Sequence, residues 1–269
     1  MNQMCKNVSS NLGSSKFYSR IANHYALTPS AVIIRTAEAE LISSLPILPP
    51  ALDLCCGDGF ITSMVHPGEF EAGCDISQDA LNKARNLDYY KILEYADVSK
   101  NIPFPDSQFE TVISNSSLEH VKDIGAALKE TARVLKPGGK LYVTFASDYA
   151  YDWWPVGKHA LQKYLGFQPV YHYDSLKKWE ERFNQNGLRV SYYCYYLSKP
   201  ATKVLLFMDY HLSNAYLGKT FSLARPIIKS MSLIPKFMWA AIWKMMFASI
   251  TINTQNKGGG IIIAAERTD

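Results

Sequence analysis

Short apolar runs alternate with helical patterns along the first half of the chain, and this alternation limits the possible fold more than any other feature. The runs that predict strands are residues 51–55, 71–75, 91–96, 109–115 and 140–145. Between the last two runs, apolar residues from Ile124 to Leu135 recur at helical spacing, and Pro137-Gly138-Gly139 predicts the end of that helix. Strands that alternate with helices predict a parallel sheet that helices cover on both faces.

The flanking segments extend this pattern. Residues 31–45 predict a helix that ends before Pro46, and residues 176–187 predict another. Residues 188–197 and 261–266 predict two further strands, separated by an apolar insert at 198–256 that is rich in methionine and tryptophan.

Composition and charge exclude several classes of protein. Hydrophobic residues make up 48% of the 269 residues and charged residues 19%, which supports a sizeable core and excludes a disordered or fibrous chain. Lysine and arginine number 28 against 24 acidic residues, a net charge of +4 that is too mild to predict nucleic-acid binding.

The cysteines and the first residues of the chain indicate the cellular compartment. The five cysteines contain no Cys-x-x-Cys pair, so they predict neither a zinc site nor a disulfide framework and favour a reducing compartment. Residues 1–17 are polar and lack the apolar run of a signal peptide. We therefore expect a cytoplasmic protein.

The strongest local motif runs from Ala51 to Gly59, where an apolar strand enters a glycine turn that opens a helix. Small residues in such a turn let a ligand approach the backbone closely. Asp53 and Asp58 would repel a pyrophosphate but not a cationic ligand. The loop therefore suits a positively charged adenosyl compound better than a nicotinamide dinucleotide, and an ordinary tight turn is the alternative.

Two further carboxylates follow strands. Asp75 ends the second strand, where a carboxylate can accept hydrogen bonds from both hydroxyls of a ribose. The alternative is that Asp75 or Ser77 caps the next helix. Asp97 ends the third strand, where a carboxylate can accept a hydrogen bond from an adenine amino group. Segments 112–121 and 133–141 complete an ordered set of five motifs.

Taken together, these motifs resemble class I S-adenosylmethionine-dependent methyltransferases that act on small molecules. The resemblance implies a Rossmann-like α/β fold, a three-layer sandwich with a seven-stranded, mostly parallel sheet whose last strand is antiparallel, plus a helical cap. It also implies a single domain over 1–269. Its parts would be a helical lid at 1–45, a cofactor-binding core at 46–147, an acceptor-side cap at 148–175 and 198–256, and the last strand within 257–269.

The resemblance implies roles for particular residues. The cofactor would contact Asp53, Cys56, Gly57, Gly59 and Asn115 at its methionine end, Asp75 at the ribose, Ile76, Asp97 and Val98 at the adenine, and Tyr25 from the lid. The chain departs from the family at Cys55, where glycine is usual, which puts the backbone geometry of the loop in question. A cysteine nucleophile at this position is the alternative.

The implied reaction is methyl transfer from S-adenosylmethionine with release of S-adenosylhomocysteine, without a metal. His120 is the candidate general base, since it follows the fourth strand and an unperturbed histidine titrates at about 6.5. A surface or helix-capping histidine is the alternative. We expect the acceptor to be a small apolar or amphiphilic molecule: a specialised metabolite, a lipid or a quinol-like ring.

Residues 221–252 place lysines beside tryptophan, methionine and phenylalanine, a pattern typical of an interfacial helix. A peripheral membrane contact, a cover over a greasy acceptor, a homodimer face and plain core all fit this pattern. Two other functions stay open: a membrane-associated binding protein without chemistry, and a nicotinamide-dependent dehydrogenase, although Thr62 stands where the third glycine of the dinucleotide motif belongs.

Overall fold

The computed structural model describes residues 11–66, 68, 70–213, 233–248, 250–252 and 256–268. The chain divides into two compact units. We call the first the helical unit (1–44, 148–169 and 195–260) and the second the sheet unit (45–147, 170–194 and 261–269). This division does not test the domain boundaries predicted above, and each unit is described by itself.

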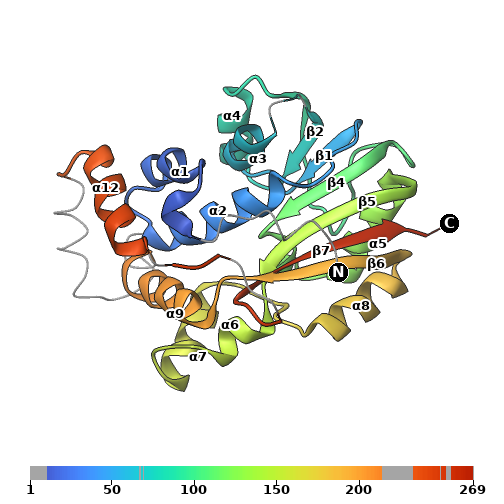
Figure 1. Ribbon diagram of the computed structural model, residues 1–269. Helices are drawn as coiled ribbons and strands as arrows, with labels where there is room; N and C mark the ends of the chain where they lie inside the picture. The colour runs from blue at the N-terminus through green and yellow to red at the C-terminus, as the bar shows by residue number, and fades with distance from the viewer. Residues whose placement is uncertain are drawn as a thin grey trace. The chain divides into compact units, whose positions relative to one another are not determined.

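A seven-stranded sheet forms the sheet unit, as predicted (Figure 1). Its strands are β1 Ala51–Leu54, β2 Phe70–Asp75, β3 Tyr90–Tyr95, β4 Phe109–Asn115, β5 Leu135–Ala146, β6 Leu188–Tyr196 and β7 Gly260–Arg267. Their order is β3-β2-β1-β4-β5-β7-β6; β1 pairs parallel with both β2 and β4, and the last strands are antiparallel. The strand order therefore reverses beside β1, which is where ligands bind in open α/β sheets.

Five helical segments accompany the sheet: α3 Phe60–Val65, α4 Gln78–Arg85, η3 Leu118–His120, α5 Ile124–Val134 and α8 Leu176–Gln185. The predicted cap is confirmed, since the side chain of Ser77 accepts a hydrogen bond from the Ala80 amide at 3.3 Å. Asp123 caps α5 in the same way through the Ala126 amide. His120 lies in η3 and is therefore not the cap of the following helix.

The junction between α5 and β5 differs from the prediction. The helix ends at Val134 and the strand begins at Leu135, five residues before the predicted start at Lys140. Pro137 disfavours helical backbone at the residue before it. The residues that were expected to stop the helix instead extend the strand, with an irregularity in register opposite Phe109 and Thr111.

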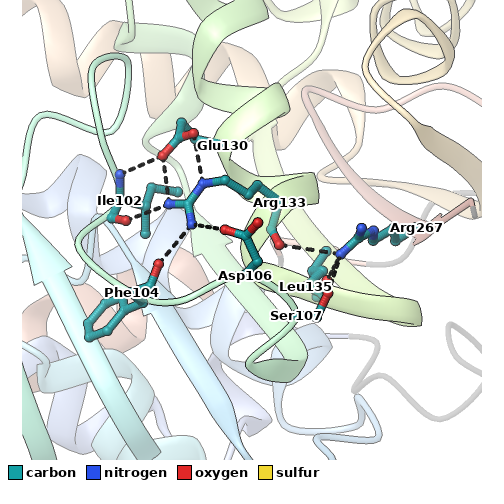
Figure 2. A network of polar contacts seen from close by, with 8 residues as sticks. All are labelled: Ile102, Phe104, Asp106, Ser107, Glu130, Arg133, Leu135 and Arg267. Atoms are coloured by element: carbon teal, nitrogen blue, oxygen red, sulfur yellow. Dashed lines mark hydrogen bonds and ion pairs between the residues drawn. The ribbon is translucent and has the colours of Figure 1, made fainter.

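Arg133 on α5 fixes the loop that leads into β4 (Figure 2). Its guanidinium donates to the carbonyl oxygens of Ile102 at 2.7 Å and Phe104 at 2.9 Å. It also pairs with the carboxylates of Glu130 at 2.8 Å and Asp106 at 2.6 Å. The hydrogen bond from Arg133 holds the pKa of Glu130 below its usual range. One side chain therefore satisfies several backbone groups of an irregular segment.

Arg267 at the end of β7 reaches the same region (Figure 2). It donates to the hydroxyl of Ser107 at 3.0 Å and to the carbonyl oxygens of Arg133 and Leu135. The end of the last strand is thereby joined to the start of β5.

The helical unit contains η2 Leu12–Ser14, α1 Tyr18–His24, α2 Pro29–Ile42, α6 Asp148–Asp152, α7 Lys158–Phe167, α9 Lys199–Met208, the π-helical turn η4 Asp209–Ser213 and α12 Lys236–Phe247. Polar contacts join these helices across long stretches of sequence. Asp209 accepts hydrogen bonds from Ser30 at 2.8 Å and Tyr164 at 2.7 Å. Glu38, fully buried, pairs with Arg35 and accepts from Tyr196.

The cysteines depart from the prediction at one position, and the predicted insert is described only in part. Cys55, Cys56 and Cys74 are free, but Cys194 is disulfide-bonded, which departs from the expectation of reduced cysteines. Of the insert predicted at 221–252, only residues 233–248 and 250–252 are among the described residues. Lys229 lies outside them, and α12 begins directly after Pro235.

Candidate active site

A cavity of about 390 Å³ lies at the carboxyl ends of the parallel strands of the sheet unit. The loops that follow β1, β2, β3 and β4 supply its walls, together with one side chain from the segment before α8. The lining residues are Cys55, Asp75, Ile76, Ala96, Asp97, Val98, Ser99, Ser116, Ser117, His120, Val121, Lys122 and Tyr171.

The glycine loop after β1 keeps left-handed backbone at three residues. Gly57 and Gly59 have φ values of 57° and 72°, and Cys55 has a φ of 59°. The cysteine thus adopts the conformation that glycine would adopt without strain. Only glycine fits at Gly59, because a Cβ there would lie 2.8 Å from the ring of Tyr90. The loop thus keeps its turn with cysteine at this position, and Cys55 is a lining residue of the cavity.

Asp53 lies beneath this loop rather than on the cavity wall. Its side chain is 2% exposed and accepts a 2.6 Å hydrogen bond from the Tyr90 hydroxyl. Burial raises the pKa of Asp53 to about 6, although hydrogen bonds from Thr62 and Tyr90 oppose the shift. In this structure, Asp53 joins β1 to β3 and supports the loop from below.

Asp75 ties the glycine loop to the end of β2. One carboxylate oxygen accepts a hydrogen bond from the Gly57 amide and the other from the Ser77 amide, both at 2.8 Å. A charged acceptor makes such bonds stronger than those between neutral groups. Ile76 follows with 59% of its side chain exposed, although it is a large apolar residue. Both residues, which the sequence predicted to contact the cofactor, line the cavity.

Asp97 is held in a tight turn at the end of β3. It accepts hydrogen bonds from the Ser99 hydroxyl at 2.7 Å and the Ser99 amide at 3.2 Å, and it pairs with the exposed Lys100. The hydrogen bonds from Ser99 lower the pKa of Asp97, so this carboxylate is ionised at neutral pH. Asp97 and Val98 both line the cavity.

The segment after β4 brings His120 to the cavity. Ser116 adopts a positive φ of 47°, and its amide donates to the Thr144 carbonyl oxygen at 2.9 Å. The turn leads into η3, where His120 is exposed and lines the cavity. Asn115 accepts a hydrogen bond from the Thr144 hydroxyl and is not a lining residue, so its predicted contact with the methionine end of the cofactor stays a prediction.

Five of the predicted site residues thus line one cavity: Asp75, Ile76, Asp97, Val98 and His120. Asp53, Cys56, Gly57, Gly59 and Asn115 lie in or beside the loops that shape it without being lining residues. Tyr25 belongs to the helical unit, so its predicted contact with the cofactor stays a prediction.

Sequence reasoning missed several lining residues. Ser116 and Ser117 stand inside the fourth motif, directly after β4, and their position could have indicated them. Tyr171 has no such signal, because it is far from the motifs in sequence. Tyr90, the hydrogen-bond partner of Asp53, was also missed, because nothing in the sequence of the third strand marks it.

The thiols of the glycine loop argue against a cysteine nucleophile. Burial raises the pKa of Cys55 and Cys56 well above the ordinary value, so both are neutral thiols at pH 7 and poor nucleophiles. Among the described residues, no group of three or more histidine, cysteine, aspartate or glutamate side chains is arranged to hold a metal ion.

Comparison with known proteins identifies the class. The family model described as "Methyltransferase domain" matches residues 52–143, which contain the glycine loop and the ends of β2, β3 and β4. Residues 52–143 are therefore a methyltransferase domain, and the chain has the class I methyltransferase fold.

Individual relatives are more distant. The chain is 31% identical over 154 residues to a demethylmenaquinone methyltransferase of Corynebacterium glutamicum (strain R), a match that covers 51% of this chain and 66% of that protein. It is 26% identical over 171 residues to a 2-phytyl-1,4-naphtoquinone methyltransferase of Nostoc punctiforme, covering 46% and 74%. The chain thus spans just under two thirds of the length of the Corynebacterium protein.

A solved structure supports the fold over nearly the whole chain. A SAM-dependent methyltransferase of Thermotoga maritima, described as a possible histamine N-methyltransferase, superposes with a TM-score of 0.59 at 14% identity. The superposition covers 94% of this chain and 99% of that one. At this identity the likeness concerns the fold and not the substrate.

Proposed function

We propose that the protein is an S-adenosylmethionine-dependent methyltransferase that binds this cofactor in the cavity of the sheet unit. The observation that carries the proposal is the glycine loop joined by Asp75 to an open cavity at the strand ends. The residues present fit the cofactor. Each Asp75 oxygen keeps a lone pair for a ribose hydroxyl, Ile76 offers an exposed apolar surface to adenine, and about 390 Å³ is typical of a small-molecule site.

When bound, S-adenosylmethionine supplies a methyl group on a positively charged sulfur, which an acceptor can attack in line. The protein's contribution is binding and orientation, which can be worth about 7–11 kcal/mol in favourable cases. Asp75 and Asp97 add negative charge to the wall, which favours a cationic ligand over a pyrophosphate.

His120 is our candidate for the group that accepts a proton from the acceptor. His120 lines the cavity after β4. It ends a short helix, and its amide donates to the Ser117 carbonyl oxygen at 3.0 Å. A base is needed only where the acceptor loses a proton as it attacks, as a phenol or quinol does.

We propose an apolar or amphiphilic acceptor of the quinol, lipid or specialised-metabolite type. The names of the two curated relatives, both quinone methyltransferases, support a ring acceptor.

The experiment uses the purified protein, S-adenosylmethionine with a labelled methyl group, and a lipid extract, alongside reduced demethylmenaquinone as a defined acceptor. We expect label in an organic-soluble product, and little label with the Asp75→Ala variant. Absence of transfer to every acceptor, in a protein that binds S-adenosylhomocysteine, would favour a binding protein without chemistry.

We further propose that the helical unit contacts a membrane surface through α12. One face of this helix packs against α1 (Figure 1). Trp243 and Phe247 are buried, and the indole of Trp243 donates to the Ala26 carbonyl oxygen at 2.8 Å. On and just before this helix, large apolar side chains are exposed. They are Leu233 at 85%, Phe237 at 68%, Met238 at 46%, Met245 at 82% and Met246 at 51%.

Charge and length favour an anionic bilayer surface as the occupant of this exposed face. Lys236 and Lys244 belong to α12 and are exposed. The described residues of the helical unit carry ten lysines and arginines against five acidic residues, whereas those of the sheet unit carry 14 against 17. In the described part of the chain, no helix is long and apolar enough to cross a membrane. An α12 that lies flat, with lysines at the headgroups, matches these features.

Sedimentation with vesicles tests this contact. We expect binding to vesicles of phosphatidylcholine and phosphatidylglycerol, weaker binding to phosphatidylcholine alone, and at least a tenfold loss in the Phe237→Glu/Met245→Glu variant. Lys163→Glu, on exposed α7 surface, changes the net charge by the same amount and should bind almost as the parent does. Equal losses in both variants, or a dimer that the double variant dissolves, would contradict the membrane contact.

A further inference from the structure

Tyr171 differs in origin from every other residue of the cavity wall. The other lining residues come from the loops that directly follow β1 to β4, and none lies beyond Lys122. Tyr171 comes from the segment that leads to α8, and it lies outside residues 52–143, the part that the methyltransferase family model matches. Neither the motifs nor the family match therefore gives it a role.

The backbone beside Tyr171 is hydrogen-bonded to the segment that follows β4. The amides of Tyr171 and His172 both donate to the Glu119 carbonyl oxygen, at 2.9 and 3.2 Å. The Nε2 atom of His172 lies 3.0 Å from the Val121 carbonyl oxygen, where it can donate. These contacts attach the segment to η3 and to the residue after it, which carry His120 and Val121 of the wall.

The same segment is also held from its far side. Asp174 pairs with Lys178 at 2.6 Å and with Arg182 at 2.9 Å, both on α8. The ring of His172 packs edge-on against the buried Trp179, with 6.2 Å between ring centroids. The position of Tyr171 is therefore set by backbone hydrogen bonds and by the side chains of neighbouring residues.

Tyr171 is nevertheless 49% exposed while it lines the cavity. An aromatic side chain held at a cavity with half its surface open is suited to stack on a planar group. Apolar surface from Ile76 and Val98 on other loops offers the rest of a slot for such a group. We propose that Tyr171 stacks on the purine ring of the adenosyl ligand and closes its site. This inference rests on the proposed function.

Calorimetric titration with S-adenosylhomocysteine and with adenosine tests the stacking. Base-on-aromatic stacking is typically lost with a roughly fivefold to hundredfold fall in affinity on substitution by alanine. We expect a loss in that range for Tyr171→Ala with both ligands, because both carry the purine. Tyr171→Phe should stay within about twofold of the parent, since the ring and not the hydroxyl makes the contact.

Tyr173→Ala is the matched control. Tyr173 lies on the same segment, is 47% exposed and is not a lining residue, so its removal should leave affinity unchanged. Tyr171→Ala that binds as tightly as the parent, or Tyr173→Ala that loses as much, would overturn the stacking and leave the proposed function intact. A folded parent protein that binds neither ligand would overturn both.

Discussion

Replacing Asp53 by asparagine should change how the stability of the protein depends on pH. The side chain is 2% exposed, and burial raises its pKa from 3.8 to about 6. An acid whose pKa is higher in the folded state binds more protons there, so the free energy of unfolding falls as pH rises through that interval. Each pKa unit corresponds to about 1.4 kcal/mol, so ionised Asp53 costs the folded state about 3 kcal/mol at pH 7.

Asparagine removes the titration but keeps the shape. Its carbonyl oxygen can still accept the hydrogen bond from Tyr90, and its amide can donate to the Thr62 hydroxyl, which contacts Asp53 in the parent. We therefore expect the variant, compared with the parent, to gain about 2.4 kcal/mol between pH 4 and pH 7, because a small part of the cost is already present at pH 4. At pH 4, where Asp53 is largely protonated, the two proteins should differ little.

Urea denaturation of both proteins at several pH values between 4 and 7 measures this difference. Carboxylates with lowered pKa, namely Asp97, Glu130, Asp174 and Glu266, give stability that is lost as pH falls, but they are present in both proteins and cancel. Asp79→Asn, which removes an exposed carboxylate of the same unit, controls for the loss of charge. A difference between parent and Asp53→Asn that stays constant across this range would refute the reasoning.

Four further substitutions test the loop, the site and the fold. Cys55→Gly should raise the free energy of unfolding by up to about 1 kcal/mol in urea denaturation, because left-handed backbone costs a residue with a Cβ about 1–2 kcal/mol and glycine returns only part of this in chain entropy; a loss would mean that the thiol packing outweighs the strain. Asp75→Ala should weaken S-adenosylhomocysteine binding tenfold or more in calorimetry, since a charged acceptor for two hydroxyls and two loop amides is lost; unchanged affinity would remove Asp75 from the site. His120→Ala should slow methyl transfer about a hundredfold at saturating acceptor, whereas an effect below about threefold would reject the general base. Arg133→Ala should lower the free energy of unfolding by about 2–3 kcal/mol while S-adenosylhomocysteine still binds, because two loop carbonyl oxygens lose a charged donor; an unchanged urea midpoint would show that the loop is held by other contacts.

The sheet was predictable because parallel strands are buried on both faces and appear in the sequence as short apolar runs. All seven predicted strands are present, with ends that mostly differ by one or two residues. The larger error, at β5, arose where Pro137 and two glycines looked like a helix stop. They lie within the strand because the helix had already ended at Val134.

The site was predictable only where it depends on strand ends. Carboxyl ends of neighbouring parallel strands converge, so Asp75, Asp97 and His120 could be expected to share a cavity, and they do. The position of Asp53 could not be inferred in the same way, since a buried aspartate and a ligand-binding one have the same sequence pattern. Its partner Tyr90 is found only through the pairing of strands.

Sequence patterns could not predict contacts between distant segments. Tyr171 reaches the cavity through backbone bonds to Glu119, some fifty residues earlier in the chain. The family match favours a methyltransferase over a dinucleotide-binding dehydrogenase, because it covers residues 52–143 with a methyltransferase domain.

Calorimetric titration of the purified protein with S-adenosylhomocysteine tests the central claim most directly. We predict micromolar binding to one site per chain, and a tenfold or greater loss in Asp75→Ala, which removes the carboxylate that joins the glycine loop to the cavity wall. A folded protein that shows no binding, or one whose affinity Asp75→Ala leaves intact, would contradict the assignment of the cofactor to this cavity.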